Sequence, residues 1–299
     1  MNKWIGILFL VGMKCMADSD SKSEASRITI FVHGTHRTNN ALGRIPGAGV
    51  YVNHEEGLYK PEECAEQYVY RRLAKTISQH SPMEFPLEHF YIFCWSGILS
   101  HEARFAAAQS LHQALNDLVI KYGKKCIITL ITHSHGGNVA LNLPKVGGTY
   151  EYMIENLMLL AVPVQKITEE NVESPLFKNV YSLYSRWDLW QIGDPQGLGY
   201  SRRMVRKVFT RGGQEQGDLE EMIPLFSQRL FLSKKVKHIE ICHATLFGNR
   251  PIGHVEFLLP HFTQNISSIL AQAISYDFSQ NVPLVFNIEK ISLFNSLFR

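Results

Sequence analysis

The feature that most constrains the fold is a short apolar run followed within a few residues by a glycine pair. Residues 127–131 are all apolar or β-branched, which predicts a strand buried on both faces of a sheet. Gly136 and Gly137 follow, and residues 138–143 are able to continue as a helix. A strand, a tight turn and a helix form the context in which a nucleophilic serine is presented at the edge of a parallel sheet. The sequence therefore indicates Ser134 as a candidate nucleophile.

The turn pattern around this serine is incomplete, and two alternatives stay open. Small residues are usual two positions before and two after the serine, whereas here Thr132 takes the first of these positions. Thr132-His133-Ser134-His135 also resembles the start of the T-H-x-H-x-D-H zinc motif of metallo-β-lactamase-like hydrolases. Gly137 and Asn138 then stand where that motif has its Asp and its third His, and catalytic zinc needs three protein ligands. The other alternative is a buried strand with a Gly-rich turn and no chemistry.

Length and charge limit the classes of function that are open. At 299 residues the chain is long enough for one large α/β domain or two small ones. Its formal net charge is only +3, and it has no basic run with interleaved aromatic residues, so the sequence argues against a nucleic-acid partner. It also lacks an uninterrupted apolar segment of the length that a membrane-spanning helix requires.

The N-terminus, residues 1–17, resembles a secretory signal peptide. A short basic start precedes an apolar run at 4–13, and small residues lead to a cleavage position after Ala17. We therefore expect export to the periplasm or the cell exterior, with 18–26 as a disordered linker. Lipid anchoring through Cys15 is a less favoured alternative, because a lysine precedes it where a small residue is preferred.

Strands and helices are expected to alternate along the chain. The expected strands are 27–32, 90–94, 127–131, 157–162, 179–184 and 237–242, and the expected helices are 61–78, 101–122 and 263–274. This alternation predicts an α/β fold with a mostly parallel sheet and helices on both faces. We expect one domain over 27–275, with a lid insertion at about 196–233, and residues 276–299 form a tail that the pattern does not place.

Polar residues after the expected strands supply the partners that a serine nucleophile needs. The hydroxyl requires a base to take its proton and a third group to orient that base. His254 is the preferred base, with His243 as the alternative. Asp188 is the preferred orienting acid, with Asp194 as the alternative. All four follow expected strands, and ligand sites in parallel sheets lie beyond the carboxyl ends of the strands.

The backbone amides of Thr35 and His135 are the expected donors of an oxyanion hole. Thr35 follows Gly34, where glycine permits a sharp turn that aims the amide at the substrate. His135 begins the helix after the serine, where the helix dipole favours an anion. We expect the imidazole of His33 to be structural and to hold this loop in place.

Taken together, these residues resemble the α/β-hydrolase superfamily and, within it, the lipase- and esterase-like serine hydrolases. The resemblance rests on His33-Gly34 after the first strand, on the order Ser134, Asp188, His254, and on residues 160–164, whose Leu-Ala-Val-Pro-Val is similar to a small-x-Pro-Val turn of such lipases. It covers about residues 27–275. It implies an α/β-hydrolase fold and hydrolysis of a carboxylic ester through an acyl-enzyme, without a metal or cofactor.

The resemblance further implies a small-molecule or lipid ester as substrate, and a lipid substrate would leave room for contact with a membrane surface. Apolar residues within 196–233 would then either face a fatty acyl chain or pack on the core. The alternative function is a catalytically silent α/β-hydrolase-fold protein that binds a ligand or a partner.

Overall fold

The computed structural model describes residues 25–35, 55–147, 150–192, 194, 230–245, 248–280 and 282–288. The expected signal peptide at 1–17, including Cys15, therefore lies outside the described residues. The same is true of most of the expected linker at 18–26 and of nearly all of the expected lid at 196–233.

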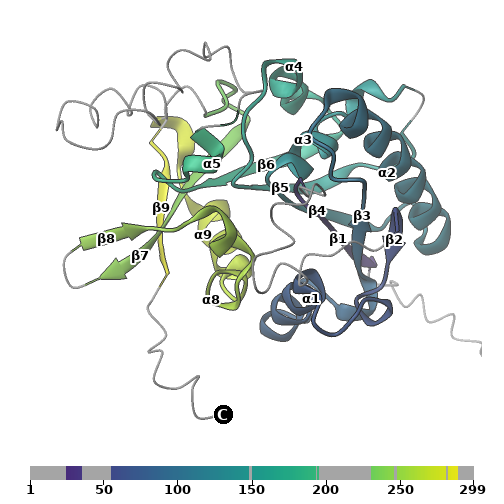
Figure 1. The fold of residues 1–299 in the computed structure, drawn as a ribbon, viewed down its shortest axis with the longest axis horizontal. Helices are drawn as coiled ribbons and strands as arrows, with labels where there is room; N and C mark the ends of the chain where they lie inside the picture. Colours follow the sequence, from purple (N-terminus) through teal and green to yellow (C-terminus); the bar gives the residue numbers. More distant parts are fainter. Residues whose placement is uncertain are drawn as a thin grey trace, which may run out of the picture.

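A single mixed sheet forms the centre of the described structure (Figure 1). Its strands are β1 (Arg27–Val32), β2 (Gly57–Tyr59), β3 (Phe90–Cys94), β4 (Ile127–His133), β5 (Ile154–Leu160), β6 (Phe177–Tyr184), β7 (Val236–Thr245), β8 (Gly248–Pro251) and β9 (Leu284–Ile288). The order is β2-β3-β1-β4-β5-β6-β7-β8, and β9 pairs with β7. All neighbours from β3 to β7 run parallel, whereas β2 and β8 are antiparallel to β3 and β7. Strand β4 is therefore central, and its carboxyl end lies near the middle of one sheet edge.

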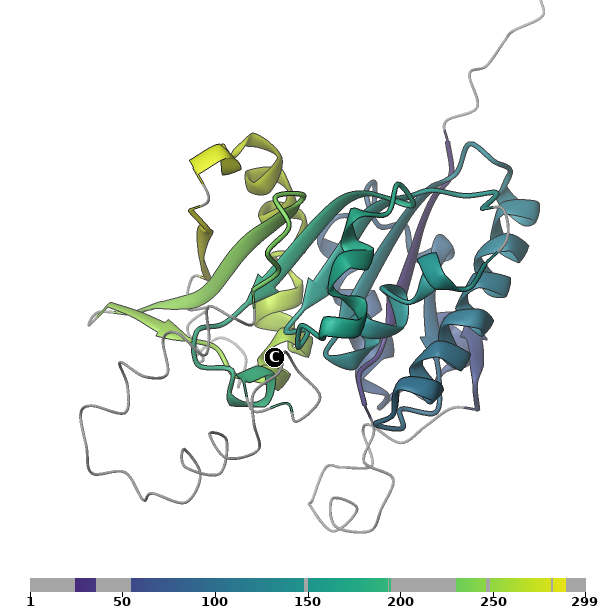
Figure 2. The same ribbon diagram turned by 90° about the horizontal axis from the view of Figure 1, so that it is seen from above.

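Helices cover both faces of this sheet, as the alternating sequence pattern predicts (Figure 2). The α-helices are α1 (Val69–His80), α2 (His101–Tyr122), α3 (His135–Ala140), α4 (Lys166–Glu169), α5 (Leu189–Ile192), α8 (Pro260–Thr263) and α9 (Ile266–Ser275). Short 3₁₀ helices are η2 (Pro61–Glu63), η3 (Leu87–His89), η4 (Leu143–Lys145), η5 (Glu170–Glu173), η6 (His254–Leu258) and η7 (Phe278–Gln280).

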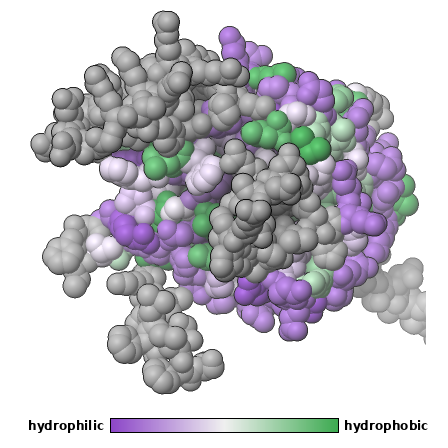
Figure 3. Space-filling model, in the orientation of Figure 1, coloured by the Kyte–Doolittle hydropathy of each residue, from purple (hydrophilic) through white to green (hydrophobic). Residues whose placement is uncertain are grey.

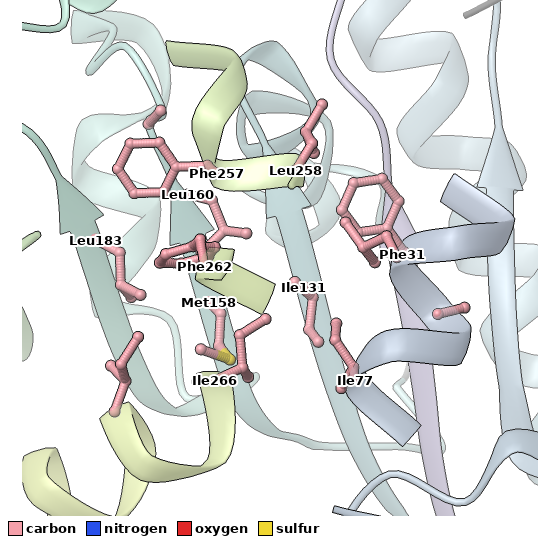
Figure 4. Close-up of a cluster of buried hydrophobic side chains, with 14 of the residues drawn as sticks. Phe31, Ile77, Ile131, Met158, Leu160, Leu183, Phe257, Leu258, Phe262 and Ile266 are labelled. Atoms are coloured by element: carbon pink, nitrogen blue, oxygen red, sulfur yellow. The ribbon is translucent and has the colours of Figure 1, made fainter. Parts of the chain in front are cut away.

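Two apolar clusters, one on each face, hold these layers together. Successive strand residues point to opposite faces, so Phe31 packs with α1, α8 and α9, whereas Val32 packs with α2 and α3. Figure 4 shows the first cluster, in which Phe257 and Phe262 from η6 and α8 lie over the strands. Both rings are fully buried, and burying a side chain of this size contributes about 1.5–3 kcal/mol. The short elements at the C-terminal end of the domain are thus firmly attached to the sheet.

Several elements have the expected bounds, and others differ for identifiable reasons. The strands at 27–32 and 90–94 and the helix at 101–122 match, and Gly123 ends that helix with φ +85°. The helix expected from residue 61 begins only at residue 69, because Cys64 has an extended backbone after the η2 turn. The helix expected at 263–274 corresponds to α9, and the separate short helix α8 precedes it.

The sheet also extends beyond the expected domain end at residue 275. Strand β9, from the tail that the sequence pattern left unplaced, pairs in parallel with β7 from Ile239 to His243. At the other edge, β2 pairs antiparallel with β3 and adds a strand that the sequence pattern did not predict. No helix among the described residues combines the length and the apolar character needed to cross a membrane.

Candidate active site

Ser134 occupies a strained turn between β4 and α3. Its backbone has φ 52° and ψ −134°, a conformation that costs a non-glycine residue about 1–3 kcal/mol. Two hydrogen bonds hold the turn, because the Ser134 amide donates to the Leu160 carbonyl at 2.9 Å and the Gly137 amide donates to the Ser134 carbonyl at 3.0 Å. The serine side chain is half-buried, whereas the residues on either side of it are buried. The turn therefore presents the hydroxyl at the carboxyl edge of the sheet.

The glycines around the turn are required by close backbone contacts. A Cβ atom at Gly136 would lie 2.4 Å from the carbonyl oxygens of Val32 and His33, which leaves no room for a side chain. A Cβ atom at Gly34 would lie 2.8 Å from the Cβ of Ser134. The loop after β1 consequently packs directly against the candidate nucleophile.

Asp188 and His254 form a hydrogen-bonded pair. His254 Nδ1 donates to Asp188 Oδ2 at 2.7 Å, and Asp188 Oδ1 accepts from the amides of Trp190 and Gln191 at 3.1 and 3.0 Å. The Asp188 side chain is fully buried, and that of His254 is 12% exposed. Because an ionised carboxylate only accepts hydrogen bonds, this arrangement keeps the proton on Nδ1. The other nitrogen, Nε2, is left as the atom that is able to accept a proton.

This pair lies beside the serine turn. The imidazole rings of His133 and His254 have centroids 4.7 Å apart, and His133 Nε2 donates to the His254 carbonyl at 3.0 Å. His133 directly precedes Ser134 in the chain. The structure therefore brings the three residues of the expected triad to the same edge of the sheet, although they are distant in sequence.

The alternative residues have other partners. His243 Nε2 lies 3.2 Å from Glu256 Oε2. Asp194 lies near His135, with 3.6 Å between Asp194 Oδ1 and His135 Nε2. Within the described residues, His254 is held by a carboxylate beside the serine turn. This geometry favours His254 as the base and Asp188 as the orienting acid.

His33 fixes the loop that carries the first expected oxyanion donor. Its ring lies between those of Tyr70 and Trp95, with centroid distances of 5.6 and 5.8 Å. The Trp95 amide donates to His33 Nε2 at 3.1 Å, so Nδ1 carries the proton in the neutral ring and donates to the Gly34 carbonyl at 2.7 Å. The Trp95 indole also donates to the His33 carbonyl at 2.8 Å. Thr35 follows this rigid segment, and His135, with the second expected donor, is the first residue of α3.

Sequence reasoning missed a buried polar cluster next to the serine. Arg104 is fully buried on α2 and donates to His101 Nδ1 at 2.9 Å, while Gln165 Nε2 donates to Asp194 Oδ2 at 3.4 Å. Burial lowers the pKa of Arg104 to about 10, and the negative charge of Asp194 opposes this shift. Burial likewise lowers the pKa of His135, again against the effect of Asp194. Arg104 falls on the buried face of its helix, and a charged residue at such a position was the signal available in the sequence.

The zinc alternative does not fit the positions of the two histidines around Ser134. Among the described residues, the side chains that converge closely enough to hold an ion are His243, Glu256 and His261. Neither His133 nor His135 belongs to that group, and each has a separate partner, as described above. The serine-based interpretation is therefore the one that the geometry of this edge supports.

Exposed apolar side chains neighbour the candidate pair in the chain. Trp187, Leu189 and Trp190 adjoin Asp188 and are 50%, 47% and 70% exposed, and Val255 next to His254 is 51% exposed. Figure 3 shows small hydrophobic patches on a largely hydrophilic face of the molecule. These residues offer exposed apolar contact area next to Asp188 and His254 in the chain.

Comparisons with known proteins find similar solved structures but no similar sequence family. No family model matches the chain, and none of the curated proteins is a significant match. The phospholipase PlaB from Legionella pneumophila is 14% identical with a TM-score of 0.33, over 72% of this chain and 38% of that one. A thermostable esterase from Pseudomonas putida ECU1011 is 12% identical with a TM-score of 0.34, over 91% and 66%. A hyperthermophilic esterase from the archaeon Pyrobaculum calidifontis is 11% identical with a TM-score of 0.32, over 88% and 66%.

The present chain thus spans between 38% and 66% of the length of these neighbours. The fold class follows from the chain's own topology. The mostly parallel sheet with helices on both faces is what the sequence led us to expect, and the structure adds the strand order β3-β1-β4-β5-β6-β7 and a serine turn with φ 52° after β4. The protein has an α/β-hydrolase type of fold.

Proposed function

We propose that the protein is a serine hydrolase that cleaves carboxylic esters, with Ser134, His254 and Asp188 as its catalytic triad. The observation that carries the proposal is the 2.7 Å hydrogen bond between His254 and the buried carboxylate of Asp188, beside a serine with φ 52°. A serine held at a positive φ is uncommon, and strain of this kind concentrates at functional sites. An imidazole oriented by a buried carboxylate is the partner that a serine nucleophile needs.

The mechanism assigns one task to each group. Ser134 Oγ attacks the ester carbonyl carbon while His254 Nε2 takes the hydroxyl proton, and Asp188 stabilises the imidazolium that forms. The amides of Thr35 and His135 donate to the oxyanion. Collapse of the tetrahedral intermediate breaks the bond to the leaving alkoxide, which takes the proton from His254. Water then attacks the acyl-enzyme with His254 as base, and the carboxylic acid and the free serine are released.

The surroundings of the triad favour a substrate with an apolar part. Trp187, Leu189 and Trp190, which are close to Asp188 in the chain, and Val255, which follows His254, provide exposed apolar surface. A panel of p-nitrophenyl esters with increasing acyl length would test this preference. We expect kcat/KM to rise from the acetyl ester to a longer acyl ester, because each buried methylene contributes about 0.8 kcal/mol. A strict preference for the acetyl ester would contradict this part of the proposal.

A fluorophosphonate probe tests the nucleophile directly. An activated serine displaces fluoride and forms a covalent phosphonyl ester, so the wild-type protein should be labelled and Ser134→Ala should not. Ser110→Ala is the matched control, because Ser110 is an exposed serine on α2, and its labelling should equal that of the wild type. A folded wild-type protein that is neither labelled nor active on any ester would support the silent ligand-binding alternative.

A further inference from the structure

A second cluster of chemically versatile side chains lies outside the proposed triad. His243 is near the end of β7, Glu256 is in η6, and His261 is in α8. Their side chains are 12%, 22% and 29% exposed, so the cluster is largely shielded from water but open on one side. The proposed esterase mechanism assigns no step to these three residues.

The distances within the cluster match those between the ligands of one metal ion. Glu256 Oε2 lies 3.2 Å from His243 Nε2 and 3.5 Å from His261 Nε2, and ligand atoms of the three residues all lie within 4.8 Å of one another. Tetrahedral zinc with bonds of about 2.0–2.2 Å to nitrogen and oxygen places neighbouring ligand atoms roughly 3.3–3.5 Å apart. The two distances to the carboxylate are therefore already close to those of a bound site.

A backbone hydrogen bond orients the carboxylate of Glu256 for this role. The Gly253 amide donates to Glu256 Oε1 at 2.9 Å and so leaves Oε2 facing the two imidazoles.

The backbone around the cluster is held by the hydrophobic core. Phe257 follows Glu256, Phe262 follows His261, and both rings are buried in the cluster that Figure 4 shows. Their centroids are 5.0 Å apart. The chain direction at both ligand positions is therefore fixed before any ion binds, which reduces the entropy that binding would cost.

Arg250 is the competing partner for the same carboxylate oxygen. Its guanidinium lies 3.2 Å from Glu256 Oε2. The Arg250 side chain is 57% exposed, and exposed ion pairs of this kind are weak, so it is able to turn into solvent when an ion binds.

We infer that His243, Glu256 and His261 form a binding site for one divalent transition-metal ion such as Zn²⁺. Two imidazoles and a carboxylate are ligands that zinc accepts, whereas Ca²⁺ and Mg²⁺ prefer oxygen alone. Water would complete the coordination. The ion would tie η6, which carries His254, to β7 and α8. It would act by stabilising this segment, with no part in the chemical step at Ser134, so the inference stands or falls independently of the proposed esterase activity.

The test uses the tag-free full-length protein, stripped with a chelator and titrated with Zn²⁺ or Co²⁺. We expect one ion per chain, a visible absorption spectrum typical of tetrahedral Co²⁺, and a rise in melting temperature with Zn²⁺. The loss of a residue that only orients a metal ligand lowers metal affinity by roughly 10- to 100-fold. His261→Ala and Glu256→Gln each remove a proposed ligand, so each should lower the affinity for Zn²⁺ by more than that. His80→Ala, at an exposed histidine on α1, is the control and should bind like the wild type.

Folding of each variant is checked by circular dichroism. Glu256→Gln retains the oxygen that accepts from the Gly253 amide, so it is the variant least disruptive to the fold. Equal affinity in the wild type and in folded Glu256→Gln and His261→Ala would assign binding to adventitious surface histidines and overturn the inference. A folded wild-type chain that binds neither Zn²⁺ nor Co²⁺ would overturn it as well.

Discussion

An Asp188→Asn variant would keep the shape of this side chain while changing which atoms are able to accept hydrogen bonds. Asp188 Oδ1 accepts from the amides of Trp190 and Gln191, and Oδ2 accepts from His254. The single amide oxygen of Asn is best placed where it satisfies the two backbone donors. Its NH₂ group then faces His254 Nδ1, which must become an acceptor and move its proton to Nε2. In that tautomer His254 is unable to accept the Ser134 proton.

The structure also gives the size of the effect. The active tautomer returns only when the Asn amide flips, and the flip leaves two buried backbone donors without acceptors. Each unsatisfied buried donor costs about 1–3 kcal/mol, so the flip costs about 2–6 kcal/mol. At about 1.4 kcal/mol for each tenfold change in rate, kcat should fall by about 30-fold to about 20,000-fold.

The assay is steady-state hydrolysis of a soluble p-nitrophenyl ester, with thermal melts to show that the variant is folded. Asp194→Asn is the matched control, because Asp194 lies near His135 and Gln165 instead of His254. We expect its loss of kcat to be smaller than that of Asp188→Asn. A folded Asp188→Asn variant with wild-type kcat, or a larger loss in Asp194→Asn, would refute the assignment of Asp188.

Four further outcomes are expected. Ser134→Ala and His254→Ala should each lower kcat by about 10⁴- to 10⁶-fold, and the double variant should lose no more than either one, because both act in one proton transfer; losses that multiply would contradict a shared step. Gly34→Ala should lower kcat with a modest loss of stability of about 1–3 kcal/mol, because its Cβ would meet the Ser134 Cβ at 2.8 Å; unchanged kinetics would show that this contact is unimportant. Thr35→Ala should lower kcat only slightly and Thr35→Pro should lower it strongly, because only proline removes the amide donor. Equal kcat values in the two variants would contradict the role of the Thr35 amide as an oxyanion donor. Burial lowers the pKa of His238 below 6.5 in the folded protein, so the unfolded chain binds a proton more readily as the pH drops below 6.5, and the free energy of unfolding should fall. His238→Gln should weaken this pH dependence of the free energy of unfolding, measured by urea denaturation, and an unchanged pH dependence would contradict the assignment.

The parts of the fold that the sequence predicted well are those with a local signal. Residues 127–131 are apolar without interruption because β4 is buried on both faces, and Ser100 and Gly123 mark the two ends of α2. Ser134, Asp188 and His254 were indicated by their places after expected strands. The parallel strands β4 and β6 bring Ser134 and Asp188 to one edge, whereas His254 follows the antiparallel strand β8.

The parts that the sequence did not predict depend on contacts between distant segments. Strand β2 has three residues and exists only by pairing with β3, and β9 adds to β7 across more than forty residues of chain. The buried Arg104 and the cluster around His243 have the same origin, because each is assembled from separate elements. A single sequence carries no local pattern for such pairings, so only the folded arrangement reveals them.

Thr132 takes a position where serine turns of this kind usually have a small residue. The structure accommodates it because the closest contacts of the turn lie after Ser134. Thr132 is fully buried, and its hydroxyl donates to the carbonyl of Met158 on β5 at 3.0 Å, so the larger side chain is accommodated and its polar atom is satisfied. The tight contacts fall on the helix side of the serine, where a Cβ at Gly137 would lie 2.4 Å from Val162 Cγ2. Ser134 nevertheless has φ 52°. The strain of this turn therefore depends on the absence of side chains after the serine, and a glycine two residues before it is unnecessary.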